Sequence, residues 1–248
     1  MTLEIRRFGG PTVSFTLGGL TFLTDPTFDA AGDYPIGPDA ALTKTAPAAG
    51  TPADAGPVDV VLLSHDQHPD NLDVAGRAFS VTVPLVLTTP DAADRVGPPA
   101  RALSTWTYVD LPRADHDGDL RVTAVPAQHG PDGTEHLTGP VTGFVLQGAG
   151  LPTVYVSGDN ASLGVVEEIA ARFPSIDVAI LFGGAARVPM LDANLTLDAD
   201  DMVKAAHLLG ATTVVPVHVD SWAHFTEGIA DVHAAFTAAG LDDRLQTR

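Results

Sequence analysis

The chain has 248 residues, 31 of them acidic and 13 basic, and a formal net charge of −18. This acidity would repel a polyanion, and no cluster of Lys and Arg is present to neutralise phosphates, so we expect no nucleic-acid partner. No apolar run approaches the roughly 18 residues that a membrane span needs. Residues 1–10 also lack the apolar stretch of a signal peptide. We therefore expect a soluble, cytoplasmic protein that does not bind membranes.

The predicted strands come early and in pairs. Two short runs separated by Gly18-Gly19 read as a hairpin, and the continuous apolar run VDVVLL reads as a buried strand. Loops are expected over 46–57, 89–100 and 129–140, where Pro, Gly and polar residues gather. The predicted strands cover 12–16, 20–24, 58–63, 81–88, 120–125, 141–146, 153–156, 178–181 and 213–217.

Helices are predicted at four places. Ser162 caps one that ends before Pro174, and Thr196 or Asp198 caps another that ends at Gly210. A short helix is expected after Pro69, and a last one over 228–239. Strands in hairpins with helices in both halves favour two packed sheets with helices outside.

Polar side chains follow four of the predicted buried strands. The segment SHDQHPDNLD, residues 64–73, comes directly after VDVVLL; His129, Asp159 and His218 each follow another apolar strand. One such histidine alone is typical of a satisfied structural residue. The fourfold repetition instead favours a metal site, since rigid strand ends are where folds place reactive groups. Asp25 follows a strand too, and its Asp-Pro step is equally well explained as a turn.

The ligand chemistry is limited by composition. The chain has no cysteine, so thiolate ligands and cysteine nucleophiles are excluded. A site made of His and Asp suits one or two divalent transition-metal ions, with zinc expected before manganese or iron.

The ordered motifs LTDP, LLSHD, PAQHG, SGD and PVH resemble the metallo-β-lactamase superfamily, in particular its branch of L-ascorbate-6-phosphate lactonase-like hydrolases. The resemblance covers about residues 8–228. It implies an α/β (α+β) fold, a four-layer αββα sandwich, and we expect residues 1–248 to form one such domain. A homo-oligomer is compatible with the sequence.

The resemblance also implies a division of the ligands. His65 and His129 would belong to a first metal site, Asp70 and His218 to a second, and Asp159 would bridge both. The usual signature H-x-H-x-D-H is altered here to HDQHPDN, residues 65–71. One inserted residue, with His65, His68 and Asp70 turned inward, reconciles most of the pattern; Gln67 is the alternative to His68, and Asn71 replaces the last histidine.

The expected reaction is hydrolysis of a small molecule. A cation held by these ligands can lower the pKa of a bound water from about 15.7 to roughly 7. Asp70 or Asp159 would orient that water or accept a proton, and a second metal or His224 would assist the leaving group. The resemblance implies a lactone, ester or amide as the substrate. A phosphate ester is less expected, because Arg187 is the one candidate near the motifs to hold a phosphate.

Three alternatives remain open on the sequence: a phosphodiesterase of the same superfamily, an iron protein that handles oxygen or electrons, and a non-enzymatic relative whose metal site has decayed.

Overall fold

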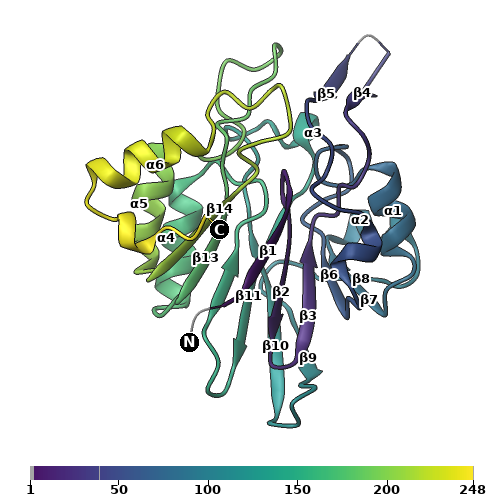
Figure 1. Cartoon of the computed structure of the whole chain (residues 1–248), viewed down its shortest axis with the longest axis vertical. Coiled ribbons are helices and arrows are strands. Elements are labelled where there is room, and N and C mark those ends of the chain that lie inside the picture. Colours follow the sequence, from purple (N-terminus) through teal and green to yellow (C-terminus); the bar gives the residue numbers. More distant parts are fainter. Residues whose placement is uncertain (1–2, 39, 248) are drawn as a thin grey trace.

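Two six-stranded sheets pack face to face in the computed structural model, which describes residues 3–38 and 40–247 (Figure 1). The first sheet has the order β1-β2-β3-β6-β7-β8. Its strands are β1 (Ile5–Gly9), β2 (Thr12–Leu17), β3 (Leu20–Thr24), β6 (Val60–Leu62), β7 (Leu85–Thr88) and β8 (Ala100–Ala102). The second sheet has the order β14-β13-β12-β11-β10-β9. Its strands are β9 (Tyr108–Pro112), β10 (Asp119–Pro126), β11 (Thr142–Gly148), β12 (Val154–Val156), β13 (Val178–Phe182) and β14 (Thr213–Val217).

Helices cover the outer faces of both sheets (Figure 1). The first sheet is flanked by α1 (Val74–Ser80) and α2 (Pro90–Val96), and the second by α4 (Leu163–Arg172), α5 (Ala199–Leu209) and α6 (Ile229–Ala238). Outside the two large sheets lie a small hairpin of β4 (Gly32–Pro35) and β5 (Ala41–Lys44) and the short α3 (Glu135–Thr138). Two 3₁₀ turns complete the set, η1 (Pro52–Ala55) and η2 (Asp242–Arg244). The expected αββα sandwich is confirmed.

Three apolar clusters hold these four layers together. In β6, Leu62 faces the cluster between the sheets, whereas Val61, and Leu63 directly after the strand, face the cluster under α1 and α2. In β13, Ile180 faces the other sheet and Leu181 faces the helices on the far side. Since both faces of such strands are buried, their sequences are continuously apolar. Each large side chain buried this way contributes about 1.5–3 kcal/mol.

The direction of the strands gathers the polar segments at one edge. β3 and β6 are parallel, and so are β12, β13 and β14. β10 runs in the same direction as β12, because each is antiparallel to β11. The segments that leave the carboxyl ends of β3, β6, β10, β12 and β14 are those that carry Asp25, His65, His129, Asp159 and His218.

Several local predictions match the structure. β2 and β3 form the expected hairpin, and Gly18 and Gly19 both adopt the positive φ that a tight two-residue turn requires. Helix α5 begins after Asp198, whose side chain accepts a hydrogen bond from the backbone N–H of Asp201. Thr196, the alternative cap, instead donates its hydroxyl to the Gly183 carbonyl.

Other local predictions were wrong. The strand expected over 81–88 begins only at Leu85, because Val81 ends α1 and the chain turns before entering the sheet. The expected loop 89–100 contains α2, capped by Thr89 with Pro90 in its first turn. The loop 129–140 contains α3, and the helix after Pro69 begins later, where Asp73 caps it. β1, β4, β5, β8 and β9 were not predicted.

Within the described residues, no helix has the length and apolarity needed to cross a membrane. The first two residues of the N-terminal segment that was considered for a signal peptide lie outside the described part of the chain.

Candidate metal centre

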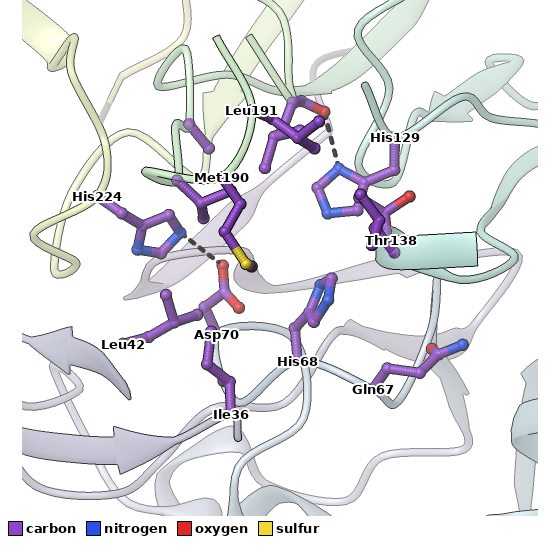
Figure 2. A pocket seen from close by; sticks show the side chains of 14 residues that line it. Ile36, Leu42, Gln67, His68, Asp70, His129, Thr138, Met190, Leu191 and His224 are labelled. Carbon is purple, nitrogen blue, oxygen red and sulfur yellow. Dashed lines mark hydrogen bonds and ion pairs between the residues drawn. The ribbon is translucent and has the colours of Figure 1, made fainter. Parts of the chain in front are cut away.

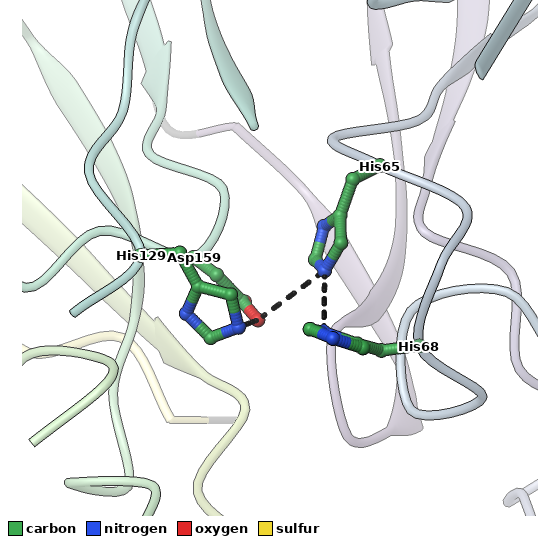
Figure 3. Close-up of side chains that lie close together, drawn as sticks. All are labelled: His65, His68, His129 and Asp159. Atoms are coloured by element: carbon green, nitrogen blue, oxygen red, sulfur yellow. Dashed lines mark hydrogen bonds and ion pairs between the residues drawn. The ribbon is translucent and has the colours of Figure 1, made fainter. Parts of the chain in front are cut away.

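The strand ends bring two groups of metal-binding side chains together. His65, His68, His129 and Asp159 form the first ligand group, with one donor atom each, all within 4.8 Å of one another (Figure 3). Asp70, Asp159 and His218 form the second ligand group by the same measure. Asp159 is common to both, so one carboxylate joins two neighbouring sites.

The distances in the first ligand group suit a single ion. His65 Nε2 lies 3.0 Å from His68 Nδ1 and 3.9 Å from Asp159 Oδ2. His129 Nε2 lies 3.5 Å from the same Asp159 oxygen. Two donors bound to zinc at about 2.0–2.1 Å with a tetrahedral angle would be roughly 3.3 Å apart. The four side chains are therefore spaced as the ligands of one metal ion are.

Hydrogen bonds behind the first ligand group fix its imidazole tautomers. His129 Nδ1 lies 2.8 Å from the Leu195 carbonyl, which can only accept, so the proton is on Nδ1. Ser64 donates its hydroxyl to Asp25 and therefore accepts from His65 Nδ1 at 2.9 Å. In both rings the lone pair of Nε2 is left to face the site, as metal coordination requires.

The second ligand group is centred on Asp70. Its Oδ2 lies 3.2 Å from His218 Nε2, which is also 3.6 Å from Asp159 Oδ1. The other ring nitrogen of His218, Nδ1, donates to the Gly183 carbonyl at 3.2 Å, so Nε2 is the nitrogen that faces Asp70 and that an ion would bind in place of its proton. His224 Nε2 reaches the same Asp70 oxygen from the other side, at 3.1 Å (Figure 2).

Two buried carboxylate oxygens lack a hydrogen-bond donor in the described part of the chain and therefore indicate whether a cation fits here. Within the described residues, Asp70 Oδ1 and Asp159 Oδ2 have no hydrogen-bond donor, although both side chains are almost fully buried. An unpaired buried carboxylate is costly unless a cation or a donor compensates it. Both oxygens belong to side chains that face imidazoles, and the donor set of His and Asp is one that zinc, manganese or iron accepts. The residues present therefore fit a metal.

Burial and charge set the protonation of the centre. Burial lowers the pKa of His65 and His68, which favours the neutral imidazoles that coordinate metals. Burial would also lower the pKa of His218, but the carboxylates of Asp159 and Asp70 outweigh it and raise that pKa to about 9. Burial would raise the pKa of Asp70, yet hydrogen bonds from His218 and His224 hold it well below its usual range.

Asp25 supports the site from behind. Its carboxylate accepts hydrogen bonds from the backbone and hydroxyl of Ser64 and from the Asn71 amide, so it belongs to neither ligand group. Full burial raises its pKa to about 7 against the effect of these hydrogen bonds. Asp25 is therefore more than a turn residue. It orients Ser64, and through Ser64 it orients the His65 ring.

The altered signature takes a definite conformation. His68 lies in the first ligand group, whereas the side-chain oxygen of Gln67 accepts from the Asp66 backbone N–H at 3.1 Å. Asp66 turns away from the metal centre and pairs with Arg95 at 2.6 Å and Arg77 at 3.1 Å. His65, His68 and Asp70 thus all face the metal centre, as expected if the H-x-H-x-D-H signature carries one inserted residue here.

Asn71 lies where the altered signature lacks its last histidine. Its amide nitrogen donates to Asp25 Oδ2 at 3.1 Å and to Asp159 Oδ1 at 3.2 Å. A donating amide nitrogen has no lone pair to offer a metal. Asn71 therefore ties the shared carboxylate to Asp25 through its amide nitrogen, whereas its carbonyl oxygen Oδ1 is buried without a hydrogen-bond partner among the described residues.

An apolar cavity of about 270 Å³ opens above both ligand groups (Figure 2). Its polar floor and wall include His68, Asp70, His129 and His224. The rest is mainly hydrocarbon, contributed by Ile36, Leu42, Leu137, Ala186, Val188, Met190, Leu191 and Leu195, with Gln67 and Thr138 between them. Among the described residues, no Lys or Arg lines this cavity.

Exposed apolar side chains form the rim of the cavity. Met190 is 70% exposed, Leu137 is 49% exposed and Ile36 is 38% exposed. They come from the loop after β13, from α3 and from the turn between β4 and β5. These residues were missed in the sequence, where the segments YPIG and VPML read as ordinary loops; a large apolar residue beside proline was the available signal.

Arg187, the candidate to hold a phosphate, does not line the cavity. Its guanidinium donates to Asn194 at 2.8 Å and lies 3.8 Å from Asp192. His136 is exposed as well, and its Nδ1 donates to the Gly133 carbonyl instead of facing the cavity.

Comparison with known proteins identifies the family. The family model described as beta-lactamase superfamily domain matches residues 21–219. The chain is 32% identical over 228 residues to a UPF0173 metal-dependent hydrolase of Pelotomaculum thermopropionicum, covering 89% of this chain and 92% of that relative.

Solved structures share the fold. A possible metal-dependent hydrolase from Veillonella parvula superposes with a TM-score of 0.83 at 18% identity, covering 100% of this chain and 97% of the other. An isothiocyanate hydrolase from Delia radicum gut bacteria superposes with a TM-score of 0.80 at 21% identity, covering 98% and 94%. At these identities the likeness concerns the fold alone.

Proposed function

The chain belongs to the metallo-β-lactamase superfamily as a metal-dependent hydrolase, and from that premise we propose that it hydrolyses a small, uncharged, largely apolar lactone, ester or amide. The observation that carries the proposal is the position of the two ligand groups at the floor of an apolar cavity that, among the described residues, no Lys or Arg lines. The lactonase-like branch stays a prediction.

The metal ligands of the proposal are the two groups described above. His65, His68 and His129 would hold the first ion, Asp70 and His218 the second, and Asp159 would bridge them. Zinc is proposed before manganese or iron. When bound, such ions supply an acidified water and a positive charge against the oxyanion that develops during hydrolysis.

The chain's own residues would place the substrate and the water. Asp70 lines the cavity and carries an oxygen with no partner among the described residues, so it can orient an entering water by accepting its hydrogen bond. Leu42, Leu191 and Leu195 enclose the space beside the ligands, which keeps bulk water from the reacting carbonyl. A hydrocarbon substituent would bury its surface against them at about 25 cal/mol per Å².

The lining of the cavity disfavours a phosphodiesterase. A phosphate is held in proteins by Arg, Lys or clustered backbone N–H groups. The one arginine expected from the sequence, Arg187, pairs with Asn194 and does not line the cavity. A phosphorylated lactone would meet the same lack of cationic side chains.

A substrate screen tests the proposal. The metal-loaded protein would be assayed with neutral lactones and aryl esters of increasing chain length, with a phosphodiester, and with an aryl isothiocyanate. We expect kcat/KM to rise with the length of the alkyl chain and no turnover of the phosphodiester. A His129→Ala variant controls for contaminating hydrolases. Turnover of the phosphodiester or of the isothiocyanate alone would refute the proposed substrate class.

A further inference from the structure

A ligand for the second ion comes from the segment after β14. We propose that His224 is a metal ligand of the second ligand group and supplies the imidazole that Asn71 does not. This inference rests on the proposed function, because it concerns the same metal centre. It differs from the leaving-group role expected for His224 from the sequence.

The distances around Asp70 carry the proposal. Asp70 Oδ2 lies 3.1 Å from His224 Nε2 and 3.2 Å from His218 Nε2. Each of these two distances to Asp70 is close to the roughly 3.3 Å expected between two ligands of one tetrahedral ion, whereas His224 lies outside the set of donor atoms that all fall within 4.8 Å of one another. Two imidazole nitrogens thus converge on one buried carboxylate oxygen, and Figure 2 shows the ring nitrogen of His224 directed at it from the cavity wall.

The second ligand group has fewer imidazoles than the first, and the His224 ring would add one. Without His224 it consists of one imidazole and two carboxylates, one of which is shared with the first ligand group. Asn71 supplies no imidazole at this position, and its amide nitrogen donates to Asp25 and Asp159. His224 would raise the second set to two imidazoles and two carboxylates, a set that zinc and the neighbouring transition metals accept.

The backbone of the 218–224 segment is built to present both histidines. His218 and Ser221 both adopt positive φ values, of 60° and 70°, a conformation that costs non-glycine residues about 1–3 kcal/mol and persists only where the surroundings enforce it. The resulting bend brings His224 back to Asp70, which also contacts His218.

Hydrogen bonds from other parts of the chain hold this bend in place. The His218 N–H donates to the Gly10 carbonyl at 2.7 Å, and the Thr45 N–H donates to the Ser221 carbonyl at 2.7 Å. The His224 carbonyl accepts from the Arg187 N–H at 3.0 Å. Because these contacts fix the backbone on both sides of the bend, the backbone that carries His224 is positioned before any ion binds.

One feature makes His224 a weaker ligand than the others. Its Nδ1 is buried without a hydrogen-bond partner among the described residues, whereas Nδ1 of His218 donates to the Gly183 carbonyl. No backbone acceptor therefore selects the tautomer of His224 that leaves Nε2 free, and we expect the second ion to bind more weakly than the first.

Metal titration tests the role of His224. Metal-free wild-type protein and the variants His224→Ala, Asn71→His and His224→Ala/Asn71→His would be titrated with Zn²⁺ against a chromogenic chelator. Co²⁺ absorption would report the ligand field of each ion. His136→Ala is the matched control, because its ring is exposed and faces the solvent. Circular dichroism would verify that every variant is folded.

We expect wild type and His136→Ala to bind two ions with distinct affinities. His224→Ala should keep the tight site unchanged and bind the second ion at least about 10-fold to 100-fold more weakly, the effect seen even for residues that only orient ligands. The double variant should recover part of that loss, because the new imidazole replaces the old one.

The alternative outcomes are distinct. Two unchanged affinities and an unchanged Co²⁺ spectrum in folded His224→Ala would overturn the ligand role, whatever happened to turnover. A single ion in wild type would overturn it as well and leave the proposed hydrolase intact with one metal. A wild type that binds no ion would refute the inference and the proposed function together.

Discussion

The two ligand groups of the centre differ in how firmly the fold holds them. The first has three imidazoles, two of them fixed by hydrogen bonds to Ser64 and Leu195. The second has one imidazole, His218, fixed in this way, and the imidazole that we propose to join it, His224, has an outer nitrogen that is unpaired within the described residues. The comparison teaches that ligand identity alone does not rank two sites; the contacts behind each ligand do so.

Removal of a ligand from the first group should have the largest effect. His129→Ala removes one of the three imidazoles of the first ligand group, and this ring also lines the cavity. We expect loss of the tight ion and a fall in kcat/KM of about 10³-fold or more, since a catalytic metal supplies several kcal/mol of transition-state stabilisation. Metal content and turnover of an ester substrate measure both. A variant that keeps tight binding would show that His129 is not a ligand.

Metal removal should rank next. An ion that binds the folded chain but not the unfolded chain raises the free energy of unfolding by about 4 kcal/mol when its free concentration is 1,000 times its Kd. For a chain of this length that corresponds to a fall in Tm of roughly 8–16 °C after chelation. Differential scanning calorimetry with and without chelator measures it. We expect most of the fall to follow loss of the tight ion; an unchanged Tm would contradict binding at a buried centre.

The support behind His65 should matter less than the ligand itself. Ser64→Ala removes the hydroxyl that connects Asp25 to His65 Nδ1, and we expect the first ion to bind about 10-fold to 100-fold more weakly while the second is unaffected. Ser162→Ala removes a hydroxyl that caps α4, where it accepts from the Val165 N–H, and is the matched control because Ser162 belongs to neither ligand group. Equal affinities in the two variants would show that the tautomer of His65 needs no such support.

The smallest effect on the metals should come from Asp66, although it lies inside the altered signature. Asp66→Asn weakens pairs with Arg77 and Arg95, which are 41% and 46% exposed. Because solvent screens such pairs, we expect a loss of only about 1 kcal/mol in unfolding free energy and unchanged metal content. Urea denaturation and elemental analysis measure the two quantities. Metal loss would place Asp66 among the ligands.

The sequence predicted the fold through its buried strands. The runs VVLL and VAILF are apolar throughout because both of their faces are covered, and VVLL leads directly into the polar segment 64–73. Short edge strands were missed: Tyr108–Pro112 alternates exposed and partly buried residues and offers little apolar signal. The helix Pro90–Val96 was missed because its proline was read as a loop signal, although proline suits a first helical turn.

The sequence also predicted which side chains gather at the centre, because strand order and strand direction bring them to one edge. It left open the choice between Gln67 and His68, which depends on the path of a single loop. Nor could it place Ile36, Leu137 and Met190 at the cavity, since these residues meet from three loops far apart in the chain.

The central claim is that one carboxylate, that of Asp159, joins two metal ions of unequal affinity. Elemental analysis of protein purified without chelator, comparing wild type with a folded Asp159→Ala variant, tests it most directly. The account predicts two equivalents of a transition metal per wild-type chain and the loss of both in the variant. A wild-type chain that takes up one ion or none, or an Asp159→Ala variant that retains the wild-type content, would contradict it.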